Sequence, residues 1–250
     1  MLPAEQSDDR PASARDIELH NRTDPHRGAS ALSDVILGGQ DGLVNVLGVI
    51  LGVAAATADS RIVLVAGLAA TFAESVSMGA VAYTSTLADA DFYESERERE
   101  YRHIRAVPRL EREEIRDIYR RKGFGGALLE RIVDTITRDE DVWVAVMMAE
   151  EHQLAPVNRG TALRSALVVG VAAIIGSLIP LVPFVLIPVQ LGMWLAIALA
   201  AGVLFAVGAY KASRTVGQPG RSGLEMALIG TVSALVGYLV GLLLKLPGPH

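Results

Sequence analysis

Five apolar stretches, each about 20 residues long, constrain the fold of this chain more than any other feature. They lie near residues 35–57, 62–88, 162–184, 189–210 and 224–244. A helix needs about 20 apolar residues to cross a hydrocarbon core roughly 30 Å thick. Because a backbone in lipid must satisfy its own hydrogen bonds, the sequence predicts an all-α, polytopic membrane protein with five transmembrane helices.

The segments around these stretches divide the chain into four parts. Residues 1–30 are rich in Pro, Ser, Asp and Arg, which is typical of a disordered tail, and they lack the apolar core of a secretory signal. Residues 31–88 hold the first two predicted helices, and residues 161–246 hold the last three. Residues 89–160 are dense in charge, so we expect a water-exposed helical insert between the second and third membrane helices.

The distribution of basic residues predicts the orientation. All Lys and Arg residues except Arg61 and Lys245 lie in the tail, in or beside the insert, or in the loop after the fourth apolar stretch. By the positive-inside rule, the N-terminus and the insert are expected in the cytoplasm. The formal net charge of -5 gives no reason to expect nucleic acid as a partner, and the absence of cysteine excludes thiolate metal sites and disulfides.

The first apolar stretch has a polar side. Helical periodicity places Asp34, Asp41 and Asn45 together on it. A carboxylate at membrane depth is costly and normally faces a bundle interior or an aqueous path, so these residues are candidates for lining an ion path. The same side carries glycines, which we expect to admit a second copy of this helix or to leave room for a cation: Gly38, Gly48 and Gly52.

The second apolar stretch adds a carboxylate and a thioether. The connection at residues 58–61 is short, so the first two helices should form an antiparallel hairpin. Glu74 and Met78 are four residues apart and therefore stack on one helix face. The alternative is that Met78 only fills a gap in the packing and Glu74 hydrogen-bonds a neighbouring helix. Glu225 lies near a membrane boundary, where we interpret it as a capping or interfacial residue.

The insert carries possible metal ligands on three of its four predicted helices. The first helix continues out of the second apolar stretch, the next runs from Pro108 to Gly123, the third covers residues 125–137, and the fourth opens at Asp139. If they pack as a bundle, carboxylates, an imidazole and thioethers can converge on a cation. Imidazole and thioether favour iron(II), manganese, cobalt or zinc over magnesium and calcium. The candidates are Glu96, Glu100, His103, Glu111, Glu114, Met147, Met148 and Glu151.

Other interpretations of the insert stay open at this point. Its arginines can pair with the glutamates as a solvated helix surface: Arg97, Arg99, Arg102, Arg112 and Arg116. Glu100 and His103 form a Glu-x-x-His element of the kind found in di-iron carboxylate bundles, so a membrane-tethered ferroxidase or a metal sensor is an alternative. Di-iron sites normally need two such elements, and neither alternative explains Asp41 and Glu74 within the membrane.

Several segments together resemble the vacuolar iron transporter family over roughly residues 30–245. They are GGQDGLVNVLGVILGVAAA, AESVSMGAVAYTST, the glutamate-rich insert with MMAEE, and the closing segments IPLVPF and GLEMALIG. The resemblance implies a five-span homodimer that moves iron(II), and in many members manganese(II), out of the cytoplasm in exchange for protons. It implies a path between the subunits lined by the first spans, no prosthetic group and no enzyme activity.

The resemblance also implies roles for particular residues. Asp41 and Met78 match path residues, and the following match metal-binding positions of the family's insert: Glu100, His103, Glu111, Glu114, Met147, Met148 and Glu151. The chain has His103 where the family usually has glutamate, and Ala82 where a glutamate is common, for which Glu74 is a candidate replacement. The excess of Arg over Lys and the short length favour the cell membrane of a prokaryote, or a vacuolar membrane in a eukaryote.

Overall fold

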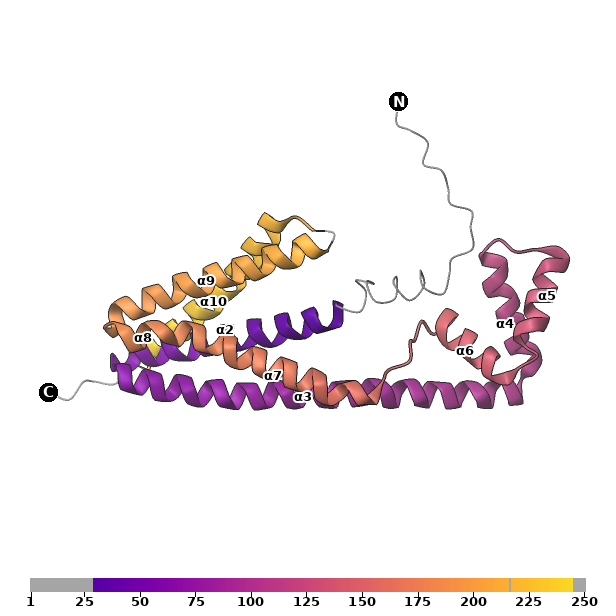
Figure 1. Ribbon diagram of the computed structural model, residues 1–250, viewed down its shortest axis with the longest axis horizontal. Helices are drawn as coiled ribbons and strands as arrows, with labels where there is room; N and C mark the ends of the chain where they lie inside the picture. Colours follow the sequence, from indigo (N-terminus) through magenta and orange to yellow (C-terminus); the bar gives the residue numbers. More distant parts are fainter. Residues whose placement is uncertain (1–28, 216, 245–250) are drawn as a thin grey trace, which may run out of the picture.

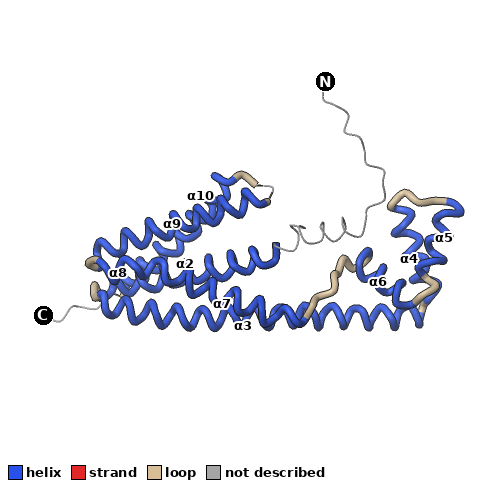
Figure 2. Tube along the Cα trace, in the orientation of Figure 1, coloured by secondary structure: helices blue, strands red, loops and turns tan. Residues whose placement is uncertain are grey.

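The computed structural model describes residues 29–215 and 217–244. All regular secondary structure in those ranges is helical (Figure 2). Five helical segments of this described part are long and apolar enough to cross a membrane. The prediction of an all-helical chain with five candidate membrane spans is therefore confirmed. The tail predicted over residues 1–30 lies outside the described residues, except for its last two, which begin the first helix.

The membrane helices follow the predicted apolar stretches. They are α2 (Ala29–Thr57), α3 (Ser60–Ala106), a segment made of η2 (Arg159–Thr161), α7 (Ala162–Leu178), η3 (Ile179–Leu181) and α8 (Val182–Leu186), then α9 (Val189–Arg214) and α10 (Pro219–Leu243). The third segment is broken where Pro180 and Pro183 occur, because proline lacks a backbone N–H and clashes with the preceding turn.

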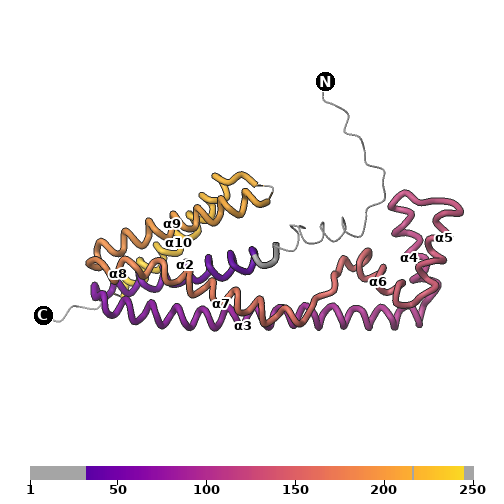
Figure 3. Tube along the Cα trace, viewed as in Figure 1, coloured from indigo at the N-terminus to yellow at the C-terminus, as the bar shows by residue number. Residues whose placement is uncertain are grey.

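The helix α2 lies in the middle of the bundle, where it contacts α3, α7, α9 and α10 (Figures 1 and 3). It forms the predicted antiparallel hairpin with α3. Ala58 adopts a left-handed conformation with φ of 52°, and the Asp59 carboxylate accepts hydrogen bonds from the backbone N–H groups of Arg61 and Ile62 at the start of α3. The large apolar side chains of α2, such as Leu47 and Ile50, are almost fully buried in this position.

The glycines of α2 bring it close to helices of the same chain, which differs from both expected uses, a second copy of α2 or room for a cation. A Cβ atom at Gly38 would meet the carbonyl oxygen of Val169 on α7. On the other side, a Cβ at Gly241 of α10 would meet the carbonyl oxygen of Gly52. Small residues allow such close backbone approach in membranes, where packing rather than the hydrophobic effect holds helices together. The faces of α2 that carry these glycines are therefore covered by α7 and α10.

The insert is built on the far end of α3, which leaves the bundle as one uninterrupted helix (Figure 1). The helices α4 (Pro108–Arg121), α5 (Gly126–Ile136) and α6 (Glu140–Glu150) pack beside it, with Ile115, Val133 and Val144 fully buried between them. The helix starts predicted at Pro108 and Asp139 are confirmed, and the Asp139 carboxylate accepts hydrogen bonds from the first N–H groups of α6.

Candidate functional site

The hairpin of α2 and α3 brings three of the predicted path residues together. The carboxyl groups of Asp41 on α2 and Glu74 on α3 lie within hydrogen-bonding reach of each other. The Asn45 side-chain amide donates to the Asp41 carboxylate over 3.1 Å. Two adjacent carboxylates repel unless a proton or a cation lies between them. The group can therefore exchange protons for a positively charged ion.

The other two predicted path residues lie one or two helical turns away. Met78 follows Glu74 by one turn on α3 and is half-buried. Asp34 precedes Asp41 by about two turns on α2, and its carboxylate accepts a hydrogen bond of 2.9 Å from the Ser165 hydroxyl of α7. The structure thus attaches Asp34 to a neighbouring helix, and it leaves Met78 on the same side of α3 as Glu74.

This polar group lies at the surface of the helix bundle. Asn45 is exposed, while Asp41 and Glu74 are half-buried. Large apolar side chains that share the helix faces of Glu74 and Asp41 are exposed, with Val81, seven residues after Glu74, at 54% and Leu37, four residues before Asp41, at 52%. A surface that combines ionisable and apolar groups at membrane depth is unfavourable in contact with lipid alone.

A cavity elsewhere in the described chain does not contain these residues. It has a volume of about 750 Å³ and lies between α2, α7 and α9. Its lining is almost wholly apolar, with Gln40 and Tyr210 as the polar side chains. A cation has no carboxylate ligand there, so the cavity is separate from the candidate ion path.

In the insert, two predicted ligands are buried together. Glu100 of α3 and Glu111 of α4 are only 3% and 4% exposed. Burial raises the pKa of Glu111 to about 8, and the neighbouring carboxylates of Glu100 and Glu114 add to this increase. Burial, followed by repulsion from Glu114, also raises the pKa of Glu151 above its usual value. Four acidic groups from α3, α4 and the end of α6 therefore share one region, where each disfavours ionisation of the others.

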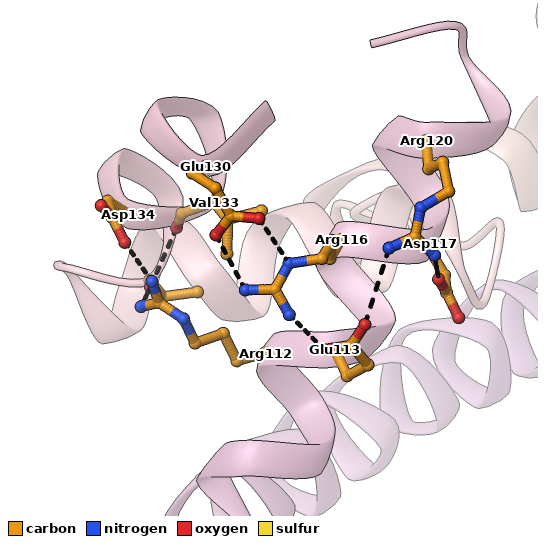
Figure 4. Close-up of polar contacts among 9 residues, drawn as sticks. Arg112, Glu113, Arg116, Asp117, Arg120, Glu130, Val133 and Asp134 are labelled. Carbon is orange, nitrogen blue, oxygen red and sulfur yellow. Dashed lines mark hydrogen bonds and ion pairs between the residues drawn. The ribbon is translucent and has the colours of Figure 1, made fainter. Parts of the chain in front are cut away.

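The arginines of the insert bind a different set of carboxylates (Figure 4). Arg116 pairs with Glu130 over 2.9 Å and also with Glu113, and Arg105 pairs with Glu140 over 2.7 Å. In the described chain no Lys or Arg forms an ion pair with the clustered glutamates, which are Glu100, Glu111, Glu114 and Glu151. Of the predicted ligands only Glu96 has such a partner within residues 29–215 and 217–244, namely Arg99 at 3.0 Å. The interpretation as a solvated, ion-paired helix surface thus holds for the carboxylates paired with arginine and not for the four clustered glutamates.

The remaining predicted ligands border this cluster. His103 is 55% exposed at its side chain, and its Nδ1 atom lies 3.9 Å from the Glu111 carboxylate. Met147 and Met148 are almost fully buried in the core of the insert. Within the described residues, no three His, Asp or Glu side chains already form a closed ligand set. The side chains would have to rotate toward a common ion.

The sequence analysis missed one residue of this cluster, His152. Its Nε2 atom lies 3.2 Å from the Glu100 carboxylate, although 52 residues separate the two in sequence. The available signal was its position: His152 directly follows Glu151 and lies four residues after Met148. Because residues four apart share a helix face, this spacing places His152 on the same side as Met148, at the end of a helix that already carries candidate ligands.

Comparison with known proteins agrees with the family resemblance. The family model described as the VIT family matches residues 32–242. The chain is 32% identical over 222 residues to vacuolar iron transporter 1 of Arabidopsis thaliana, covering 88% of this chain and 89% of that one. The vacuolar iron transporter of Plasmodium falciparum is 28% identical over 224 residues, with coverages of 86% and 82%. This chain therefore belongs to the VIT family.

Proposed function

We propose that this protein transports divalent metal ions, iron(II) or manganese(II), out of the cytosol in exchange for protons. The observation that carries the proposal is the membrane-depth group in which Asp41 and Glu74 adjoin each other and Asn45 binds Asp41. The relatives are named as vacuolar iron transporters, which supports transport over the ferroxidase and sensor alternatives.

The exchange follows from competition at the carboxylates. A cation that arrives between Asp41 and Glu74 favours their ionised forms and releases protons, and returning protons displace the cation. Asn45 supplies an additional oxygen and holds Asp41 in place. Met78 provides a thioether one turn from Glu74, and such a ligand favours iron(II) over magnesium. We assign Asp34, tied to Ser165, to the entrance of the path.

A homodimer fits the exposure of this group. Asp41, Glu74 and Asn45 lie at the surface of one chain beside strongly exposed apolar residues. A second copy related by a two-fold axis would cover the apolar side chains and place a second set of carboxylates opposite the first. The path would then run between the subunits, shielded from lipid on both sides.

The insert, in this proposal, gathers cargo on the cytoplasmic side. Its clustered carboxylates have no Lys or Arg partner in the described chain, so they are free to bind a cation. The basic residues around the insert favour the cytoplasmic orientation, and the host membrane would be the cell membrane of a prokaryote or a vacuolar membrane.

Transport in liposomes tests this function. Purified protein is offered iron(II) or manganese(II) on one side, and internal metal and pH are recorded together. We expect coupled metal and proton fluxes, and a loss of both in Asp41→Asn and Glu74→Gln. The matched control is Glu225→Gln, because Glu225 is exposed and paired with Arg221 away from the path. Wild-type transport by Asp41→Asn, or metal flux without proton flux, would contradict the proposal.

A further inference from the structure

We propose that His152 is a metal ligand of the insert and acts together with Glu100 to select metals that bind imidazole. This inference rests on the proposed role of the insert and adds an imidazole from the end of α6 to its carboxylates. His103, the other imidazole of the cluster, lies on the more exposed side, next to Glu111.

The first observation is that Glu100 is buried without an ion pair to any Lys or Arg of the described chain. Its side chain is 4% exposed, and its Oε1 atom is buried without a hydrogen-bond partner. Leaving a buried carboxylate oxygen unpaired costs free energy, so such an atom normally has a partner, which can be a bound ion. Glu111 also lies within hydrogen-bonding reach of Glu100, which directs both carboxyl groups into the same space.

The second observation is the position of His152 relative to Glu100. The Nε2 atom and the Glu100 Oε2 atom are 3.2 Å apart. Two adjacent ligands at a right angle, each about 2.1 to 2.3 Å from a metal, lie about 3.0 to 3.2 Å from each other. A metal ion can thus be bound by both atoms with little movement of either.

The backbone fixes His152 at this place. Its N–H donates to the Met147 carbonyl over 3.2 Å, and the N–H of Leu154 donates to the Met148 carbonyl over 2.9 Å. Gln153 between them has a φ of 54°, the left-handed conformation that ends many helices. The side chain of His152 is only 30% exposed. The imidazole is therefore held against Glu100 before any ion arrives.

The chemical consequence is selectivity. Carboxylates alone suit magnesium and calcium, whereas imidazole nitrogen shifts preference towards iron(II), cobalt and zinc. Loss of a group that merely supports a metal ligand already costs about ten- to a hundredfold in affinity. We expect His152→Gln to weaken cobalt(II) binding by at least about tenfold while changing magnesium binding less than threefold, because Gln retains a hydrogen bond to Glu100.

Pulsed electron paramagnetic resonance of bound manganese(II) tests the contact directly. The full chain in nanodiscs is compared with a single-histidine chain that keeps only His152 among its five histidines. We expect nitrogen hyperfine coupling of an imidazole in both proteins and its loss after His152→Gln in the single-histidine chain. Emission of the buried Trp143 verifies that each variant retains a folded insert.

The outcomes distinguish a failure of His152 as a ligand from a failure of the insert as a metal-binding domain. Manganese bound by the single-histidine chain without imidazole coupling overturns the assignment of His152 and leaves metal gathering by the insert standing. An unchanged ratio of cobalt to magnesium affinity in His152→Gln also overturns it. A wild-type insert that binds no metal at all overturns the role of the insert itself and this inference with it.

Discussion

Replacing Glu111 by glutamine should stabilise the metal-free insert at alkaline pH. The Glu111 carboxyl is buried beside Glu100 and Glu114, and its pKa rises from 4.5 to about 8. Between these values the folded insert keeps a proton that the unfolded chain has released. The folded state then binds more protons, so the free energy of unfolding falls as pH rises from about 4.5 and the loss is complete above about 8.

The magnitude follows from the size of the shift. About three and a half pH units at 1.36 kcal/mol each give an upper limit of about 5 kcal/mol at pH 9. Because Glu111 interacts with the neighbouring carboxyls of Glu100 and Glu114, one substitution should recover about half of this, roughly 2 to 3 kcal/mol. Below pH 4.5 the difference between Glu111 and glutamine should vanish, since the carboxyl is neutral in both states.

Tryptophan fluorescence can isolate the unfolding of the insert. The chain has two tryptophans, and Trp143 is 7% exposed in the insert whereas Trp194 is 69% exposed in α9. In a Trp194→Phe background, urea titrations followed by Trp143 emission in the presence of a chelator give the free energy of unfolding at pH 6 and pH 9. The matched control is Glu113→Gln, because Glu113 is exposed and paired with Arg116.

The expected result is a wild-type insert that is less stable at pH 9 than at pH 6. About half of the difference should be removed by Glu111→Gln, whereas Glu113→Gln should retain all of it. Added manganese(II) should also remove the difference, because a bound cation favours the ionised carboxylates. Equal stability of the metal-free wild type at both pH values would refute the reasoning. Full pH dependence in Glu111→Gln would do the same.

Three further substitutions test the packing and the helix ends. Gly241→Leu should destabilise the membrane domain by at least about 1 to 3 kcal/mol in thermal unfolding, because its side chain meets the backbone of α2, whereas Gly202→Leu, which faces open space, should not. Arg116→Gln should cost about 1 kcal/mol of insert stability in urea, less at high salt, and leave metal affinity unchanged. Asp59→Ala should cost about 1 kcal/mol in thermal unfolding by removing the cap of α3, and wild-type stability would contradict that role.

The sequence predicts the helices because their causes are local. Apolar length sets the five membrane spans, and single residues such as Pro108 and Asp139 set helix starts. The pairing of Asp41 with Glu74 also follows from a short turn, which forces α2 and α3 to run side by side. Each of these depends on residues near one another in the chain.

Burial and long-range contacts depend on packing that no spacing rule contains. Glu113 and Glu114 are consecutive, yet Glu113 binds arginines at the surface while Glu114 faces Glu111 and Glu151. The contact of His152 with Glu100 depends on where α6 lies against α3. The glycines of α2 pack against α7 and α10, which is neither of the two uses predicted from their spacing.

Because α3 is one continuous helix, a tilt at its membrane end displaces its insert end. Glu74 in the membrane and Glu100 in the insert lie on the same helix, about 39 Å apart at 1.5 Å per residue. A tilt of α3 by about 10° around Glu74 would therefore carry Glu100 sideways by about 7 Å, more than one helical pitch. Any rocking of the membrane helices would thus be amplified at the insert, so that in the proposed homodimer the distance between the two inserts would report the state of the proposed path.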